Sequence, residues 1–302
     1  MKRLYIILLG FICLVSCKKE YNFKIDSSVQ DRLVIEANLN NLNTPQMIRL
    51  TQMEKMLKPV DHSSSGNKKH GIPVDKAKVV LTDGKGKSYT FKRYVEFEGA
   101  TFNGYYRFEK QIPAHSGDKF TLTVSVKGKV YKAESIVESC PDIIKIKYTL
   151  AKSEIPGKED QYVPLISFTN PDKPAYYLLR EVEVNTNSDG TEFISWSNRA
   201  WTFSILSSKM LNKNVVDLRV DDGQSPSGSS FYLGGPGSTI RVYMFALNKE
   251  TYKFYESLIR QFDNDGGAFQ PFPSSAPTNF SNNAIGWFNI SDGRYADVKI
   301  GK

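Results

Sequence analysis

Cysteine is scarce in this chain, and its positions exclude an internal disulfide framework. Of 302 residues only three are cysteine, and Cys13 and Cys17 both lie near the start. A mature chain that begins at Cys17 keeps Cys140 as a single thiol without a partner for an intramolecular bridge. No histidine stands beside Cys140 in the sequence, so we interpret it as a buried structural thiol and not as a nucleophile. Stability is therefore expected to come from packing.

Long apolar runs are also absent, with one short exception at the N-terminus. The run from Leu4 to Val15 is shorter than the roughly 20 residues that a membrane-spanning helix needs. Two basic residues precede this run, and a small residue and Cys17 follow it, which is the pattern of a lipoprotein signal. We predict a signal peptide over residues 1–16 and acyl chains on Cys17. The alternative is an ordinary secretory signal with an incidental cysteine.

Motifs for enzymatic chemistry are missing. The stretch Gly223–Ser227 lacks the last glycine of a nucleophile elbow. Gly86-Lys87-Ser88 ends like a phosphate-binding loop, but Leu81 stands where the first glycine of that motif belongs. We therefore expect that the protein is not an enzyme, and a secreted hydrolase is disfavoured.

Metal-binding patterns are equally weak. The three histidines lack the H-E-x-x-H spacing that places two ligands on one helical face. Asp263 and Asp265 resemble the start of a calcium loop, but Ser274 occupies the position where an EF-hand needs an acid. We predict no metal site and leave open a weak calcium site near Asp263. The one prosthetic group expected is the covalent lipid on Cys17.

The charge of the chain is weakly basic and spread along its length. Lysine and arginine number 40 against 32 acidic residues, a formal net charge of +8. Removal of the signal peptide takes two basic residues with it, so the mature chain keeps about +6. A nucleic-acid-binding domain concentrates its basic residues in one patch or stripe. Nucleic acid is therefore not an expected partner, and export through the envelope agrees with this exclusion.

Alternation of apolar and polar residues indicates a mostly β protein, supported by an aromatic content of 12%. Residues 17–30 show no periodic alternation of apolar and polar residues, and we expect them to form a lipidated tether. Residues 31–140 carry short strands separated by turns, which predicts an N-terminal β-sandwich of the immunoglobulin or transthyretin-like kind. The expected strands are Leu33–Asn38, Met47–Thr51, Lys78–Thr82, Ser88–Phe91, Tyr105–Phe108, Phe120–Val124 and Val130–Ala133.

The pattern restarts near Cys140, so residues 141–302 are expected to form a second β-rich domain. One amphipathic helix is expected within it, over residues 249–262. Asn248 can cap this helix, and Tyr252, Tyr255 and other apolar residues recur at helical spacing, which predicts packing against a sheet. The strands expected here are Ile143–Tyr148, Val163–Phe168, Tyr176–Val184, Glu192–Trp196, Val216–Val220, Thr239–Phe245, Ala284–Ile290 and Tyr295–Ile300.

Several segments are typical of one family when they occur in this order. They are Leu33–Glu36, Ile48–Thr51, Ala77–Asp83, Gly117–Leu122, Tyr131–Ser135 and Tyr252–Phe262, followed by Asn279, Asn283, Gly286 and Phe288. Together they resemble the domain-of-unknown-function 4249 family of Bacteroidota outer-membrane lipoproteins over nearly the whole mature chain. Genes of that family often lie beside genes for TonB-dependent receptors, so the resemblance implies a role in nutrient capture. It brings no catalytic residues.

The signal and the resemblance together predict an outer-membrane lipoprotein, surface-exposed or facing the periplasm. We expect an accessory or ligand-capture subunit of a TonB-dependent uptake system. Its partners would be the outer membrane, a TonB-dependent receptor, and a small ligand, peptide or glycan. The alternative is a structural or adhesive surface lipoprotein without a transport partner.

Two loop segments are the candidate ligand-binding sites, because rigid sheets commonly display binding residues on their connections. The loop Lys55–Asp75 is long, polar and basic. The segment 196–201 presents two tryptophans beside an arginine, which suits stacking on a sugar or peptide. The candidate residues are Lys68, Lys69, Trp196, Arg199 and Trp201. For the tryptophans, the alternative is packing in the core of the second domain.

Overall fold

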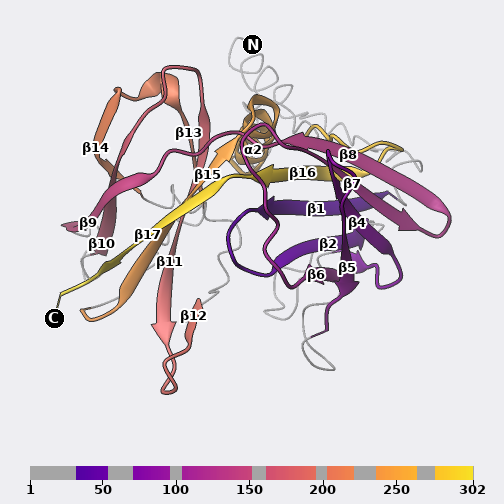
Figure 1. Ribbon diagram of the computed structural model, residues 1–302, viewed down its shortest axis with the longest axis horizontal. Helices are drawn as coiled ribbons and strands as arrows, with labels where there is room; N and C mark the ends of the chain where they lie inside the picture. The colour runs from indigo at the N-terminus through magenta and orange to yellow at the C-terminus, as the bar shows by residue number, and fades with distance from the viewer. Residues whose placement is uncertain are drawn as a thin grey trace, which may run out of the picture.

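The chain folds into two β units with one α-helix between them (Figure 1). The computed structural model describes residues 32–53, 71–95, 104–151, 161–194, 203–220, 236–263 and 276–301. Within these ranges the protein is mostly β, which confirms the predicted fold class. Among the same residues, we find no helix with the length and apolar character that crossing a membrane requires.

The first unit is one sheet that curls back on itself. Its strand order is β16-β1-β2-β6-β5-β4-β7-β8, with the short β3 beside β2. The two ends of this order meet, because the backbone N–H of Ile290 in β16 donates to Ser135 Oγ in β8 at 3.3 Å. Ile35, Leu122 and Phe288 are among the core side chains that the curled sheet buries. The strands are β1 (Leu33–Asn40), β2 (Gln46–Gln52), β3 (Ile72–Pro73), β4 (Lys78–Asp83), β5 (Ser88–Arg93), β6 (Tyr105–Phe108), β7 (Lys119–Val126), β8 (Lys129–Ile136) and β16 (Ile285–Ser291).

Strand β16 comes from the C-terminal half of the chain and pairs in parallel with β1. The register runs from Val34 opposite Ile285 to Asn40 opposite Ser291. The sequence predicted this strand but assigned it to the second domain, because period alone does not reveal which strand is the neighbour. The domain boundary at residue 140 stays a prediction. Strand β16 comes after that boundary in the sequence but belongs to the sheet formed by the strands before it.

The second unit contains two smaller sheets. One has the order β14-β10-β9, and the other has the order β12-β11-β15-β17 with β13 also beside β11. Phe168, Tyr177 and Met244 belong to the core between them. The strands are β9 (Ile143–Ala151), β10 (Gln161–Thr169), β11 (Tyr176–Thr186), β12 (Glu192–Ile194), β13 (Ser204–Ser207), β14 (Asn214–Arg219), β15 (Thr239–Leu247) and β17 (Gly293–Lys299), and a short 3-10 helix η2 (Ser208–Met210) precedes β14.

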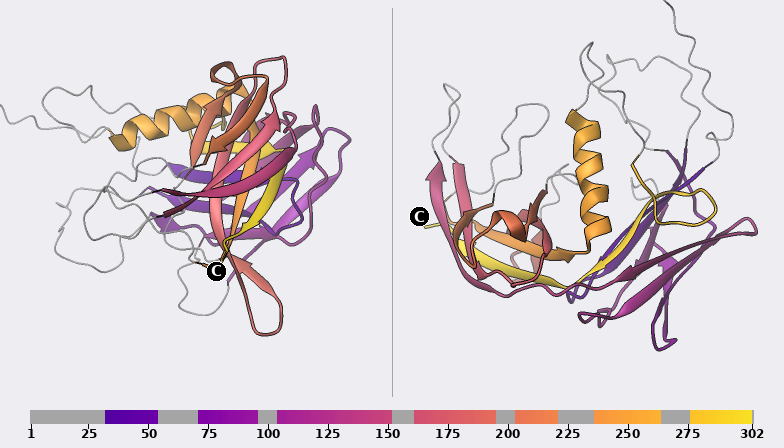
Figure 2. Two further views of the ribbon diagram at one scale, coloured as in Figure 1. Left: turned by 90° about the vertical axis from the view of Figure 1, so that its left-hand side faces the viewer. Right: turned by 90° about the horizontal axis from the view of Figure 1, so that it is seen from above.

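The helix α2 (Lys249–Asp263) stands between the two units (Figure 2, right). Its predicted cap is present, because the backbone N–H of Thr251 donates to Asn248 Oδ1 at 2.8 Å. Aromatic contacts hold the helix to both units. Tyr252 packs on Tyr176 of β11 with ring centroids 4.7 Å apart, and Phe254 stacks on Trp287 of β16 at 5.1 Å. The helix therefore fixes the two units against each other.

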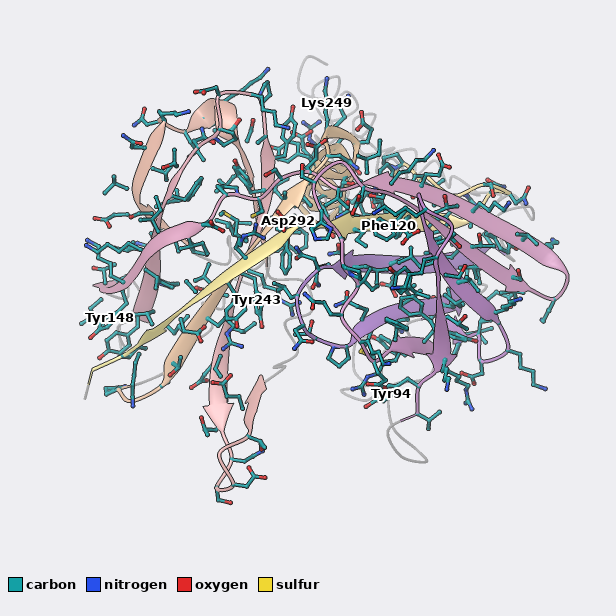
Figure 3. The ribbon with its side chains drawn as sticks, viewed as in Figure 1. Tyr94, Phe120, Tyr148, Tyr243, Lys249 and Asp292 are labelled. Atoms are coloured by element: carbon teal, nitrogen blue, oxygen red, sulfur yellow. The ribbon has the colours of Figure 1, made fainter. Side chains whose placement is uncertain are left out.

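A buried carboxylate closes the junction between the units. Asp292 is the single residue between β16 and β17, and Figure 3 shows it where the chain crosses from one unit to the other. Its carboxylate accepts hydrogen bonds from Asn41 Nδ2, the backbone N–H of Cys140 and the guanidinium of Arg294. Its backbone carbonyl accepts from the N–H of Ala246 at 2.9 Å. Four segments that are distant in sequence thus meet at one residue.

Candidate functional site

A cavity of about 300 Å³ lies where α2 begins, and it is the best-placed candidate for a ligand in the part of the chain that the structure describes. Four segments form its walls: the β8–β9 connection, the β10–β11 connection, η2, and the passage from β15 into α2. The lining residues are Glu138, Ser139, Lys173, Pro174, Ala175, Tyr176, Lys209, Ala246, Leu247, Asn248 and Lys249. We call this cavity the lysine pocket.

Hydrogen bonds to Ser208 hold the walls of the lysine pocket in place. The hydroxyl of Ser208 accepts from the backbone N–H of Ala175 at 2.8 Å, and the N–H of Ser208 donates to the carbonyl of Ala175 at 2.8 Å. Ser208 is buried, so these bonds are shielded from water. They fix η2 against the β10–β11 connection and thereby bring Lys209 to the same cavity as Lys173.

The lysine pocket carries a positive charge. Lys173, Lys209 and Lys249 contribute three ammonium groups from three different elements, against one carboxylate from Glu138. That carboxylate pairs with Lys173, whose Nζ lies 3.7 Å away, so the lining residues keep a net positive charge. The start of α2 adds the partial positive charge of a helix N-terminus. This arrangement suits a small molecule that bears a carboxylate or a phosphate.

The floor of the lysine pocket is apolar enough to hold the body of such a molecule. Leu247 is buried, and Tyr176 is half-buried with its ring against Tyr252 of the helix. Ligand sites in proteins commonly combine an apolar wall with a few polar groups that fix orientation. Ala246 lines the pocket and donates from its N–H to the Asp292 carbonyl at 2.9 Å, so the pocket lies near the contact between the units.

A second hollow, of about 490 Å³, lies along β8. We assign it a structural role and not a ligand. Its lining includes Lys132, Glu134 and the residues 278–281. The backbone N–H of Ser281 donates to the Lys132 carbonyl at 2.8 Å, and Asn279 Nδ2 donates to the Glu134 carbonyl at 3.4 Å. This segment covers the outer edge of β8 and so protects it from pairing with another chain.

An aromatic row crosses the outer face of the larger sheet in the second unit. Tyr243 stacks on Phe245 with centroids 5.8 Å apart and also contacts Tyr295 at 5.9 Å. Arg241 lies over the Tyr295 ring at 4.5 Å and donates two hydrogen bonds of 2.7 Å to the Asp297 carboxylate. These bonds raise the pKa of the Arg241 guanidinium. Because its charge is already paired, Arg241 stabilises the sheet and is a poor choice for a ligand contact.

The candidate residues from the sequence lie outside the described part of the chain. This applies to Cys17, Lys68, Lys69, Trp196, Arg199 and Trp201, and to the side chain of Asp263. Their roles therefore stay predictions. The structure does place the ends of the two candidate segments. Part of the predicted loop Lys55–Asp75 is strand β3, which pairs with Gln52 in β2, and the segment 196–201 connects β12 to β13, both of which pair with β11.

The lysine pocket was not predicted from the sequence. Its lysines are separated by 36 and 40 positions (173, 209 and 249), and solvent-exposed lysines follow no period. The one available signal was Asn248, which marks the start of α2 and thus of a region of partial positive charge. Within the described ranges, no group of three or more His, Cys, Asp or Glu side chains could hold a metal ion.

Cys140 is a buried free thiol, as predicted. Its Sγ donates to the carbonyl of Met244 at 3.4 Å. Burial, followed by the nearby Asp292 carboxylate, raises the pKa of this thiol to about 12 from its ordinary value of 9.0. Between these two pH values the unfolded chain loses the proton while the folded chain keeps it. The contribution of the Cys140 thiol to the free energy of unfolding is therefore fully present below pH 9.0, and it is lost as the pH rises toward 12.

We expect Cys140 to resist thiol reagents at pH 8 in the folded protein and to react as one thiol after denaturation. The free energy of unfolding should fall above pH 9.0 by about 1.4 kcal/mol per pH unit from this group. In Cys140→Ala the free energy of unfolding should fall with pH less steeply, by about 1.4 kcal/mol per pH unit. The remaining fall comes from groups such as buried Tyr177, whose pKa is also raised by burial. Urea titrations at several pH values measure both slopes, and identical slopes would contradict the assignment.

Fold and site together define a two-unit β protein with a helix at the junction and a basic pocket beside it. The chain belongs to the family described as Domain of unknown function (DUF4249), which it matches over residues 18–294. This confirms the family resemblance seen in the sequence. No curated protein matches the chain.

Two solved structures show weak similarity. A DUF4785 family protein from Legionella pneumophila subsp. pneumophila str. Philadelphia 1 shares 7% identity at a TM-score of 0.23, covering 71% of this chain and 51% of that one. Bovine butyrophilin shares 9% identity at a TM-score of 0.18, covering 72% and 89%. The chain thus spans about half the length of the Legionella protein. TM-scores this low carry no argument about fold or function.

Proposed function

We propose that the chain is a lipid-anchored protein of the cell envelope that captures a ligand for a TonB-dependent outer-membrane uptake system, without catalysing a reaction itself. The observation that carries this proposal is the lipoprotein signal that ends at Cys17. Diacylated and thus doubly anchored proteins stay stably at a bilayer. Membership of the DUF4249 family supports the proposal. Genes of this family often lie beside genes for TonB-dependent receptors, as noted for the resemblance above.

The lysine pocket supports a ligand that carries a carboxylate or a phosphate. Three ammonium groups beside an apolar wall can bind the anionic head and the body of one small molecule. The pocket opens on segments that α2 and Ser208 hold in fixed positions, so little ordering is needed when the ligand binds. A capture subunit needs this kind of preformed site.

The test compares three strains that produce the wild type, Cys17→Ser, and a pocket variant with Lys173, Lys209 and Lys249 changed to Gln. We expect wild-type protein to incorporate labelled palmitate, to fractionate with membranes and to co-purify with a TonB-dependent receptor after gentle solubilisation. Cys17→Ser should lose the label and the membrane association. The pocket variant should keep both, because its anchor is unchanged.

Ligand capture is then measured by thermal melting of purified proteins with small organic acids, amino acids and sugar phosphates. A bound ligand raises the melting temperature by mass action, and we expect at least one compound to do so for the wild type. The pocket variant should show an affinity at least about tenfold lower. The matched control changes Lys85, Lys87 and Lys110, three exposed lysines elsewhere, to Gln and should behave as the wild type. Membrane anchoring with neither receptor nor ligand would favour the structural or adhesive alternative.

A further inference from the structure

The first unit has a basic end at the point where the N-terminal chain enters it. Arg32 is the first residue described, and its Nε donates to the carbonyl of Asn283 at 2.7 Å. Asn282 Nδ2 donates to the carbonyl of Val130 at 2.6 Å. These bonds place the start of β1 beside the turn between β7 and β8. We name this region the tether end, and it comprises Arg32, Gly71–Lys78, Arg93–Val95, Lys127–Lys129 and Asn282–Asn283.

The charges of the tether end are almost all positive. Six basic residues lie in it against one acid, Asp75, which pairs with Arg93 at 3.2 Å. The basic residues are Arg32, Lys76, Lys78, Arg93, Lys127 and Lys129. The four lysines are exposed, so their ammonium groups reach the solvent. An apolar side chain, Val130, is 41% exposed beside the turn.

The opposite end of the same unit is electrically balanced. Apart from Asp292, which is paired with Arg294 at the junction, its described turns and strand ends carry four lysines and four acids, which are Lys85, Lys87, Lys110, Lys119, Asp83, Glu109, Asp118 and Glu138. Among the described residues, the positive charge of the first unit is therefore concentrated at the tether end and is not spread evenly. Figure 1 shows that the turn between β7 and β8 and the start of β1 point away from the second unit.

The length of chain before Arg32 brings the tether end close to the bilayer. Under the proposed function, on which this step rests, Cys17 carries the lipid and residues 18–31 join it to Arg32. Fully extended, these residues span at most about 50 Å. The anchor thus holds the basic end near the lipid headgroups at high effective concentration.

We propose that the tether end binds the anionic headgroups of the phospholipid bilayer and so sets the orientation of the protein on the membrane. Basic residues near an anionic surface are attracted without a shaped site, and the attraction adds over several lysines. In this orientation the second unit lies on the side away from the lipid (Figure 1), and most residues that line the lysine pocket belong to it. The pocket is then open to the compartment from which it collects its ligand.

Two turns of the same composition allow a matched test. Lys127-Gly128-Lys129 lies at the tether end, and Lys85-Gly86-Lys87 lies at the balanced end. Changing both lysines of either turn to Glu alters the net charge of the protein equally. The test uses the full mature chain with Cys17→Ser, so that acylation and the receptor play no part. Binding is measured by flotation with vesicles of phosphatidylglycerol and phosphatidylcholine, and with vesicles of phosphatidylcholine alone.

We expect binding to the phosphatidylglycerol vesicles only, and a loss of that binding at high salt. The K127E/K129E variant should bind at least about tenfold more weakly, whereas K85E/K87E should change binding by less than about twofold. Equal losses in both variants would overturn the proposal, because net charge alone would explain them. Equal binding to the vesicles with and without phosphatidylglycerol would also overturn it. Failure of palmitate labelling or receptor co-purification would contradict the proposed function and leave this result unaffected.

Discussion

Replacing Gly286 with alanine should remove at least about 4 kcal/mol of stability, a large share of the 5–15 kcal/mol that a domain commonly has. Gly286 has a φ of +107°, and a Cβ built on it would lie 2.1 Å from the carbonyl oxygen of Ile35. Backbone atoms of a central strand cannot move aside cheaply. The parallel pairing of β16 with β1 would therefore have to separate at this point. Urea denaturation followed by circular dichroism measures the loss.

Gly86 provides the control for this prediction. It also has a positive φ, +86°, but a Cβ there would meet nothing within 4 Å. Gly86→Ala should therefore cost only about 1–2 kcal/mol, from backbone conformation alone. If the two variants lose equal stability, the close approach of β16 to β1 is not what requires glycine at residue 286.

Asp292→Ala should cost about 3 kcal/mol, because it removes the acceptor shared by three donors at the junction of the units. Asn41 Nδ2, the N–H of Cys140 and the Arg294 guanidinium all donate to this carboxylate. Asp292 is 6% exposed, so water cannot replace the acceptor without rearrangement. Buried donors left without an acceptor, one of them charged, carry most of the cost. Chemical denaturation monitored by tryptophan fluorescence measures it.

The matched control is Asp142, which binds the same arginine from the surface. Its Oδ1 accepts from Arg294 Nε at 2.6 Å, but its side chain is 85% exposed. Exposed ion pairs contribute about 0–1 kcal/mol, so Asp142→Ala should change stability by no more than that. A loss as large as that of Asp292→Ala would show that charge on Arg294, and not the buried junction, determines the effect.

Strands such as β1 and β8 were predictable because buried and exposed residues alternate along them. In β1 the burial of Leu33, Ile35 and Ala37 alternates with the partly exposed Val34 and Glu36, as the sequence indicated. Helix α2 was predictable from its cap and its period. Observed bounds differ from the predicted ones by one to three residues: α2 ends one residue later, at Asp263, and β8 ends three residues later, at Ile136.

The partners of the strands were less predictable. The four residues of β13 are all half-buried and show no alternation, so no strand was expected there. The parallel neighbour of β1 lies 251 positions away, and local pattern contains no information about it. The lysine pocket depends on those long-range arrangements, because η2 and α2 meet only in the folded chain. A site built from exposed lysines on separate elements therefore cannot be predicted from the local sequence pattern.

The way β1 is paired has a mechanical consequence for a tethered protein. Any pull on the N-terminal chain enters the fold at Leu33 and acts along the axis of β1. That strand lies between β2 and β16, and its ladder bonds run across the axis. The bonds are then loaded together in shear and do not open one after another. Because β16 continues through Asp292 into β17, tension applied to the N-terminal chain is shared by both units.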